Sequence, residues 1–298
     1  MGLRAMNAAF GIDHPLLATH DIEGLRAQLI SLGFNMTAIG KHPWGTSTSL
    51  AMFKGCLIEI MGVYDRSLVD EIPAGDFRFG RHVFAHLQLR EGVALSALHS
   101  TDAIADAETA QAAGFTLAGH LEFGRDVTLP DGTAGRTKTT LALLPDAVFP
   151  RLSLFLCQQH RPDLIYVPEW LAHPNTVSGI CGVNVVAEAT DQDALKPKFS
   201  ALYEGAVDIE GGFACDTANG VMRFMTAMAF EQEIGPLSAA TQDAPSPFIA
   251  GMDLLVDDPA IFSEYLKISG MGFVDGADRF TLTQPALTAN TVLRFLSR

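Results

Sequence analysis

One pattern of elements in residues 11–64 recurs along the chain, and this recurrence constrains the fold more than any other feature. The pattern begins with a short apolar segment at 15–19. An amphipathic segment at 22–32 follows, with Asp21 placed as its N-cap and Gly33 as its C-cap. Three further segments have the length and the alternation of strands, at 35–39, 48–52 and 57–63. The predicted order is therefore β-α-β-β-β.

The end of the predicted helix has a sequence that returns later in the chain. Leu-Gly-Phe at 32–34 is followed by Ala-Gly-Phe at 113–115, Tyr-Glu-Gly at 203–205 and Gly-Met-Gly-Phe at 270–273. Four copies of one supersecondary unit indicate internal duplication, and their irregular spacing argues against a solenoid. We predict four units that pair two by two, at 11–64, 82–160, 178–230 and 248–298.

The chain has 298 residues, which is enough for two domains. The segment 160–177 contains three prolines and reads as an extended link, so we place the break near 165–177. The predicted domains are 1–170 and 171–298. The fold class is α+β.

Composition excludes some classes of function. The net charge of -14 argues against nucleic acid or an anionic membrane surface as a partner. No apolar run reaches membrane-spanning length, and the first residues are too short for a secretory signal. The four cysteines lack CxxC spacing, which indicates a reducing compartment and no zinc knuckle. We expect a cytoplasmic protein.

Glu59 is the first candidate for chemistry. Strand alternation places Leu57, Glu59 and Met61 on one face and Ile58 and Ile60 on the other. The second face suits packing under the helix, so the first face must accommodate a carboxylate. A buried carboxylate needs a cation, a donor or water. We predict metal ligation, and the alternative is an edge glutamate that faces solvent or an arginine.

Two histidines occupy similar places in the first two units. His14 starts the first strand, where Pro15 favours extended geometry, and His86 lies in a strand predicted at 83–89 before a helix at 93–113. Alone, either histidine is more commonly a half-buried side chain with a satisfied ring. Together with Glu59 they form a set that suits Fe(II), Mn(II), Ni(II) or Zn(II).

A fourth position falls at the end of the second unit. Gln158 matches Glu59 there and is expected to bind metal, a metal-bound water or substrate. Cys157 replaces it if the register is shifted by one residue, and His160 competes for the same place. His82 is a competitor of His86.

The sequence Gly-Lys-His-Pro-Trp-Gly-Thr lies between the second and third strands of the first unit. Lys41, His42 and Trp44 near a cavity mouth suit an anionic or aromatic substrate. A tight turn with exposed side chains is an equally good interpretation.

The last two units lack this chemistry. Their first strands offer only Asn184 and Asp253, and their last strands carry no glutamate or histidine. We expect the C-terminal half to be a degenerate copy that serves as lid, dimer surface or scaffold. Motifs of nucleotide binding, serine hydrolysis and HExxH zinc proteases are absent from the sequence.

These residues resemble the vicinal oxygen chelate (VOC) superfamily, and more closely its glyoxalase-like branch. The resemblance rests on IDHPLLATHDIE, LGF, GKHPWGT followed by LAMF, and LIEIMG, with CQQHRP and HPN later. It is strongest over 11–64 and fair over 82–177. Over 178–298 only the pattern of units matches.

The resemblance implies βαβββ modules that pair into curved mixed sheets around a cavity. It also implies one divalent metal, held by residues of the first and last strands of two modules. By position these are His14, Glu59 and His86, with Gln158 at the fourth place. Glyoxalases usually have a glutamate base at that place, so glutamine is a departure. Ring-cleaving dioxygenases share the four-module length but normally keep their ligands in the C-terminal pair.

Three functions follow as expectations. The first is a metal-dependent lyase or isomerase that chelates vicinal oxygens of a small substrate, with Glu59 and Gln158 as catalytic groups. The second is a non-haem Fe(II) extradiol-type dioxygenase. The third is a metal-free protein that binds or sequesters a small molecule. The fold alone does not choose among them, and a homodimer is left open.

Overall fold

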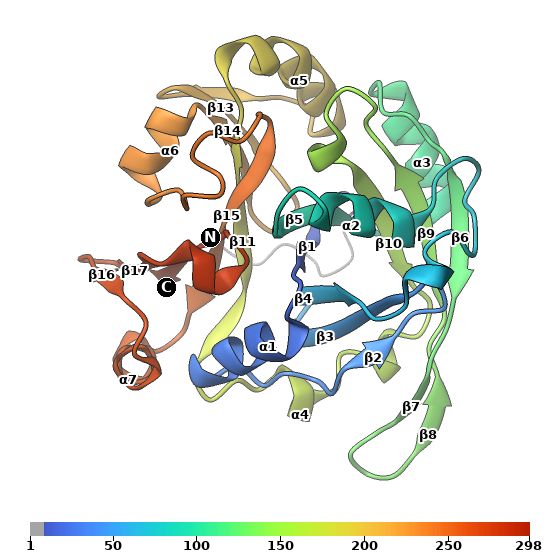
Figure 1. Cartoon of the computed structure of the whole chain (residues 1–298), viewed down its shortest axis with the longest axis horizontal. Helices are drawn as coiled ribbons and strands as arrows, with labels where there is room; N and C mark the ends of the chain where they lie inside the picture. Colours follow the sequence, from blue (N-terminus) through green and yellow to red (C-terminus); the bar gives the residue numbers. More distant parts are fainter. Residues whose placement is uncertain (1–8) are drawn as a thin grey trace.

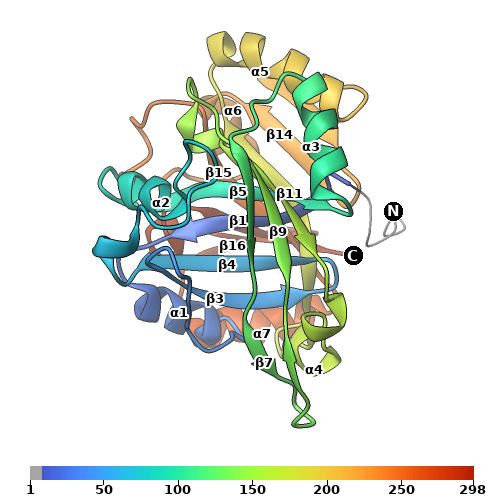
Figure 2. The ribbon, with the colours of Figure 1, turned by 90° about the vertical axis from the view of Figure 1, so that its right-hand side faces the viewer.

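The computed structural model describes residues 9–298, which form two eight-stranded mixed sheets. The strand order is β2-β3-β4-β1-β5-β10-β9-β6 in the first sheet and β12-β13-β14-β11-β15-β18-β17-β16 in the second. Each sheet joins two units through antiparallel pairing of their first strands, β1 with β5 and β11 with β15. Figure 1 shows the two curved sheets side by side, and Figure 2 shows the first sheet in front of the second. The predicted α+β class with four paired units is confirmed.

The first unit contains the predicted cap and all but one of the predicted strands. Asp21 accepts a hydrogen bond from the backbone N–H of Gly24 at 2.9 Å, and Gly33 has a φ of 83°. The strand predicted at 35–39 is wrong, because that segment is irregular and only two residues after it pair with β3. The elements are β1 (Ile12–Ala18), α1 (Ile22–Ser31), β2 (Gly40–Lys41), β3 (Thr46–Phe53) and β4 (Cys56–Val63).

The second unit starts later than predicted. Residues 83–89 are not a strand: 83–87 belong to α2 (Phe79–Leu87), which precedes the unit, and 88–89 form the turn after it. The unit comprises β5 (Gly92–Ser100), α3 (Ala103–Ala112), β6 (Gly119–Phe123), β9 (Thr139–Leu144) and β10 (Leu154–Gln159). A hairpin of β7 (Asp126–Thr128) and β8 (Ala134–Arg136) projects from it (Figure 2).

Helical spacing explains the error at 83–89. Phe79, Val83, His86 and Leu87 are buried together on one face of α2. A run of seven residues fits this period and a strand period equally well, so periodicity alone does not separate them. The N-cap shows where the helix of the second unit begins. Asp102 accepts hydrogen bonds from backbone N–H groups at the start of α3, as Asp21 does for α1.

The second sheet is built from the last two units. Their elements are β11 (Val177–Val186), α5 (Ala189–Leu202), β12 (Val207–Ile209), β13 (Gly212–Asp216), β14 (Val221–Met225), α6 (Ala227–Glu233), β15 (Phe248–Val256), α7 (Pro259–Ser269), β16 (Phe273–Asp275), β17 (Arg279–Leu282) and β18 (Val292–Ser297). Short helices lie outside the units: η1 (Arg66–Leu68), η2 (Pro150–Leu152), η3 (Pro162–Leu164), α4 (Pro168–Leu171) and η4 (Pro285–Thr288). The predicted domain boundary at 170/171 lies in the connector between β10 and β11.

Both domains contribute to one apolar core on the helix-covered sides of the sheets. Ile58 and Ile60 of β4 belong to this core, and so do side chains of α7 and β18. The ring of Phe34 lies 6.5 Å from that of Phe295 in the other domain. We call the face of each sheet that lies opposite this shared core its inner face.

A second apolar cluster covers the inner face of the first sheet. It includes Leu16, Leu95 and Phe155 from the sheet and Phe79 and Val83 from α2. The predicted alternation in β4 is thus confirmed, because Ile58 and Ile60 face the shared core while Met61 faces this cluster. Within residues 9–298, no helix is both long and apolar enough to cross a membrane.

Candidate functional site

A cavity of about 70 Å³ lies on the inner face of the first sheet. That volume is several times what one water molecule needs, so it suits a compact ligand. Aromatic side chains form much of the wall, and a few polar groups converge on it. The aromatic lining residues include Trp44, Phe79, Phe123 and Phe155, and the polar ones include His14, His42, Glu59, Arg125 and Gln159.

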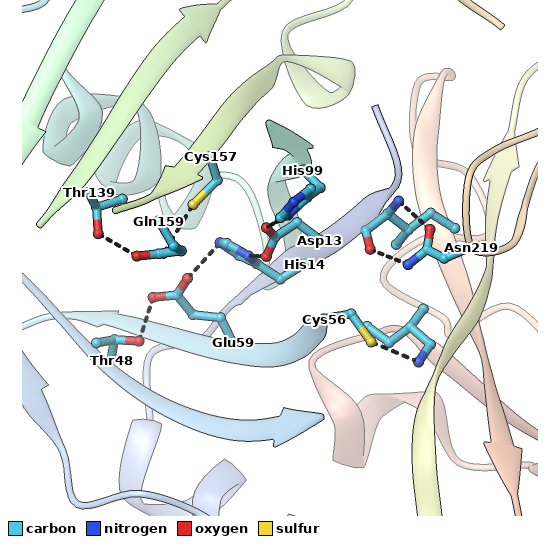
Figure 3. A network of polar contacts seen from close by, with 12 residues as sticks. Asp13, His14, Thr48, Cys56, Glu59, His99, Thr139, Cys157, Gln159 and Asn219 are labelled. Carbon is cyan, nitrogen blue, oxygen red and sulfur yellow. Dashed lines mark hydrogen bonds and ion pairs between the residues drawn. The ribbon is translucent and has the colours of Figure 1, made fainter. Parts of the chain in front are cut away.

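A chain of hydrogen bonds runs along the cavity floor through His14 (Figure 3). The Nδ1 atom of His14 lies 2.6 Å from Oδ1 of Asp13, and its Nε2 atom lies 3.1 Å from Oε2 of Glu59. The other Glu59 oxygen accepts from the Thr48 hydroxyl at 2.5 Å. His14 and Glu59 come from adjacent parallel strands, β1 and β4, so the sheet register brings them together.

A register shift in β1 allows the neighbouring residues Asp13 and His14 to take part in the same chain of hydrogen bonds. Successive side chains of a regular strand point to opposite faces. The pairing of β1 with β5 shifts between Ile12 and His14, and Asp13 lies in that irregularity. Asp13 therefore reaches His14, and its second oxygen lies 3.4 Å from Nδ1 of His99.

The three ionisable groups set each other's charge. Burial alone lowers the pKa of His14, but the carboxylates of Asp13 and Glu59 outweigh it and raise that pKa to about 9. Burial alone raises the pKa of Asp13 and Glu59, but the His14 imidazolium lowers both to about 2. At neutral pH the cavity floor therefore holds one imidazolium between two carboxylates.

A second polar pair lines the cavity, formed by His42 and by Arg125 from the loop before β7. Arg125 Nη2 lies 2.6 Å from His42 Nε2, and His42 Nδ1 lies 2.9 Å from the Thr46 hydroxyl. Because a guanidinium only donates, His42 Nε2 accepts and its ring is neutral. Burial, with the charge of Arg125, lowers the pKa of His42 to about 3. The His42 ring stacks on Trp44 with centroids 4.7 Å apart.

The family model described as "Glyoxalase-like domain" matches residues 12–203. The chain belongs to the glyoxalase-like domain family. The predicted resemblance to the glyoxalase-like branch of the VOC superfamily is therefore confirmed. No curated protein matches the chain in sequence.

Solved structures share the fold of this glyoxalase-like protein at low sequence identity. A hypothetical protein from Staphylococcus aureus has a TM-score of 0.66 at 11% identity, covering 97% of this chain and 99% of that one. A mutant of 4-hydroxymandelate synthase from Streptomyces coelicolor has a TM-score of 0.60 at 12% identity, covering 97% and 93%. A xylose isomerase-like TIM barrel/4-hydroxyphenylpyruvate dioxygenase fusion protein has a TM-score of 0.59 at 11% identity, covering 100% and 50%.

His86, the predicted third metal ligand of the glyoxalase-like domain, does not join His14 and Glu59. It lies on α2, outside the cavity lining, and its surroundings are basic rather than acidic. Burial, followed by the charges of Arg90 and other basic neighbours, lowers the pKa of His86 to about 3. The reason for the displacement is the helix described above, which moves the start of the second unit beyond residue 86.

Gln158 also lies away from the cavity. Its Oε1 accepts from the backbone N–H of Ala103 at 3.0 Å and its Nε2 donates to Thr101 O at 2.7 Å, so it holds the start of α3. The side chains one residue either way, Cys157 and Gln159, line the cavity instead. The sequence analysis allowed for this alternative, in which a shift of one residue replaces Gln158 by Cys157.

Of the remaining predicted site residues, some line the cavity and others lie elsewhere. His42 and Trp44 line the cavity, whereas Lys41 is exposed and lies over the Tyr64 ring at 4.6 Å. Neither competing histidine lines it: His82 contacts the Ala94 carbonyl at 3.0 Å, and His160 contacts the Thr140 hydroxyl at 2.8 Å.

The second unit offers apolar residues where the first has ligands. In the first unit, Glu59 of β4 pairs with Leu16 of β1. The corresponding pair in the second unit is Phe155 of β10 with Ala97 of β5. Within residues 9–298, no three side chains of histidine, cysteine, aspartate or glutamate are grouped for a metal ion. Burial raises the pKa of Cys157 well above its usual range, so this neighbour is a thiol and a poor ligand. The donors present do not fit the expected three-ligand metal.

In the second domain, the same strands carry an ion-pair network. Asp253 on β15 accepts two hydrogen bonds from Arg294 on β18, both at 2.8 Å, and one from Arg223 on β14 at 2.8 Å. Asn184 on β11 donates to the same carboxylate at 3.0 Å. Both carboxylate oxygens of Asp253 thus accept hydrogen bonds from side chains of the protein, which suits a structural role.

Sequence reasoning missed Asp13 and Arg125. Asp13 was not predicted because regular strand alternation places it on the face opposite to His14. Only the register shift of β1 allows its side chain to reach His14. Arg125 lies in an irregular stretch between β6 and β7, where no periodic signal exists. The motif from 40 to 46 was the one available hint, because it supplied the ring that Arg125 contacts.

Proposed function

We propose that this glyoxalase-like protein binds a compact, flat, anionic small molecule in the cavity without a divalent metal. The observation that carries the proposal is the environment of Arg125. Its guanidinium lines a largely apolar cavity with four aromatic side chains in its wall, and its side-chain hydrogen-bond partner is the neutral His42. A guanidinium has five N–H donors in a planar fork that suits a carboxylate or similar group.

A second donor supports an acceptor-bearing ligand. Trp44 lines the cavity with 1% of its surface exposed, and its indole Nε1 has no hydrogen-bond partner among residues 9–298. Buried Trp N–H groups usually find a partner. A ligand oxygen near the indole and Arg125 would satisfy both.

The walls favour a flat apolar body for the same ligand. The rings of Phe79 and Phe123 surround Trp44 at centroid distances of 5.3 and 5.1 Å, and Phe155 meets the His14 ring at 5.5 Å. Aromatic walls with a few directed polar groups are typical of small-molecule sites. The two carboxylates on the floor are balanced by His14 and Arg125, so an anion near Arg125 meets no net negative charge.

The His14–Glu59 pair favours a second candidate function, a proton-transfer isomerase or lyase. A substrate oxygen that replaced Glu59 at His14 Nε2 would face an imidazolium donor, which stabilises a developing oxyanion. Glu59 would then be free to accept a proton. We do not propose dioxygenase activity, because the two-histidine-one-carboxylate set is not assembled by these residues.

Calorimetric titration of chelator-treated protein with benzoate and with benzamide tests the proposal. The two probes share the ring and differ in charge. We expect saturable binding of benzoate, at least about tenfold tighter than that of benzamide. Binding that appears only after zinc, nickel, manganese or iron(II) is added would contradict it and favour the metal-dependent alternatives.

A further inference from the structure

Three basic side chains gather where the first domain meets the second, outside the cavity described above. His86 lies near the end of α2, Arg90 follows in the loop before β5, and Arg151 belongs to η2. Figure 1 shows the start of β5 and the end of α2 beside β15 of the other domain. At this junction Asn290 Nδ2 donates to the backbone carbonyl of Glu91 at 3.1 Å.

These side chains hold an unusual concentration of buried nitrogens that have no hydrogen-bond partner. Among residues 9–298, five buried side-chain nitrogens lack a hydrogen-bond partner, and four of them belong to this cluster. They are Nε2 of His86, Nε and Nη1 of Arg90, and Nε of Arg151. His86 is only 6% exposed, so bulk water does not satisfy its ring. Buried polar groups are nearly always paired, which points to a missing acceptor.

The positive charge of the cluster is also uncompensated within the described chain. Arg90 lies over the Phe248 ring at 4.2 Å, and Arg151 donates to the Pro245 carbonyl at 3.3 Å, but no described carboxylate forms an ion pair with either. Burial and the charge of Arg151 lower the pKa of Arg90 to about 10, so its guanidinium is still charged at neutral pH.

The neighbouring carboxylates are engaged elsewhere. Glu91 accepts from the Thr19 hydroxyl at 2.8 Å and from the His20 backbone N–H at 2.7 Å. Asp146, in the loop before η2, pairs with Lys198 at 2.6 Å. The acceptor that completes the cluster therefore comes from outside the described residues.

We propose that His86, Arg90 and Arg151 bind a phosphate-type oxyanion at the domain junction, either inorganic phosphate or the phosphomonoester group of a small molecule. A tetrahedral dianion matches two guanidinium charges and offers acceptors in several directions. A carboxylate offers one charge and two coplanar oxygens, which serve a single guanidinium. The anion would lie beside Phe248 and Pro245 of the second domain and so link the two domains.

Calorimetric titration of the full chain at constant ionic strength tests this site. The probes are inorganic phosphate, glycerol phosphate and acetate. The variants are Arg90→Gln and Arg151→Gln, with Arg81→Gln as the matched control, because Arg81 is an exposed arginine of α2 that pairs with Asp70. We expect saturable phosphate binding that each cluster variant weakens by about tenfold or more and the control leaves unchanged. Acetate should bind more weakly.

The two phosphate probes separate the two sources of the anion. Tighter binding of glycerol phosphate would support a phosphomonoester ligand, and equal binding would support the free ion. Phosphate binding that is not saturable, or that Arg90→Gln and Arg151→Gln leave unchanged, would overturn the proposal.

Thermal unfolding gives a readout that does not depend on heat signals. A ligand that binds only the native state raises the melting temperature with concentration. Phosphate should therefore stabilise the wild type and the Arg81→Gln control but not Arg90→Gln or Arg151→Gln. Without phosphate, Arg90→Gln should be at least as stable as the wild type, because it removes an unpaired buried charge. Equal stabilisation of all four proteins by phosphate would refute a specific site.

Discussion

Replacing Glu59 with glutamine removes one of the two charges that hold His14 protonated while keeping the shape of the side chain. The glutamine carbonyl can still accept from His14, and its amide can donate to the Thr48 hydroxyl. The variant Glu59→Gln should therefore fold, with the hydrogen bonds of the cavity floor preserved. What changes is the pKa of His14.

The size of this change follows from the geometry. Unit charges 3.1 Å apart attract by about 5 kcal/mol at an effective dielectric constant of about 20, before the cost of burial is subtracted. Asp13 and Glu59 together raise the pKa of His14 to about 9 against the burial that lowers it. If the two carboxylates share the effect, removing Glu59 lowers that pKa by at least about one unit, or about 1.4 kcal/mol.

Side-chain NMR of the histidine ring nitrogens measures this directly. In the wild type His14 should remain an imidazolium at pH 7.5 and titrate near 9. In Glu59→Gln its midpoint should fall measurably. A wild-type His14 that is neutral at pH 7.5, or a midpoint that Glu59→Gln does not move, would refute the charge assignment of the cavity floor.

Further predictions concern pH, the second domain and the second unit. The ionised Glu59 contributes to the free energy of unfolding above about pH 4.5, and this contribution is lost as the pH falls through about 2. The protonated His14 contributes fully below about pH 6.5, and its contribution is lost as the pH rises through about 9. Denaturant titrations across pH should show both losses in the wild type, and the acid loss should shrink in Glu59→Gln. Asp253→Asn leaves buried arginine charge unpaired and should cost about 3–5 kcal/mol of unfolding free energy, whereas the exposed Asp257→Asn should cost less than about 1 kcal/mol; equal losses would contradict this. Asp102→Ala removes the cap of α3 and should cost about 1 kcal/mol by the same assay, and an unchanged midpoint would argue against the cap.

Much of the fold was predictable because its signals are local. Asp21 before an apolar period and Gly33 after it define α1, and the return of the glycine-containing sequence at the helix end gives the four units. The face of Glu59 was predictable for the same reason, since alternation in β4 needs only five consecutive residues. Sheet order and the shared core between the domains depend on long-range packing, which no local pattern encodes.

The site was predictable only in part. His14 and Glu59 meet because both lie on regular strands of one unit, and His42 and Trp44 reach the same cavity. His86 was misplaced because a short amphipathic run fits helix and strand periods alike. Gln158 does not match Glu59, whose counterpart in the second unit is Phe155, and it lies on the face of β10 away from the cavity that Cys157 and Gln159 line. The metal role assigned to these residues remains a prediction, and the donors brought together do not favour it.

Fluorescence of Trp44 offers the most direct test of the proposed cavity function. The chain has two tryptophans, so Trp170→Phe leaves Trp44 as the sole indole reporter. We expect benzoate to change this emission saturably in the presence of a chelator, and the added substitution Arg125→Gln to weaken binding by about tenfold or more. Binding that the chelator abolishes, or that Arg125→Gln leaves unchanged, would contradict a metal-free anion site at Arg125.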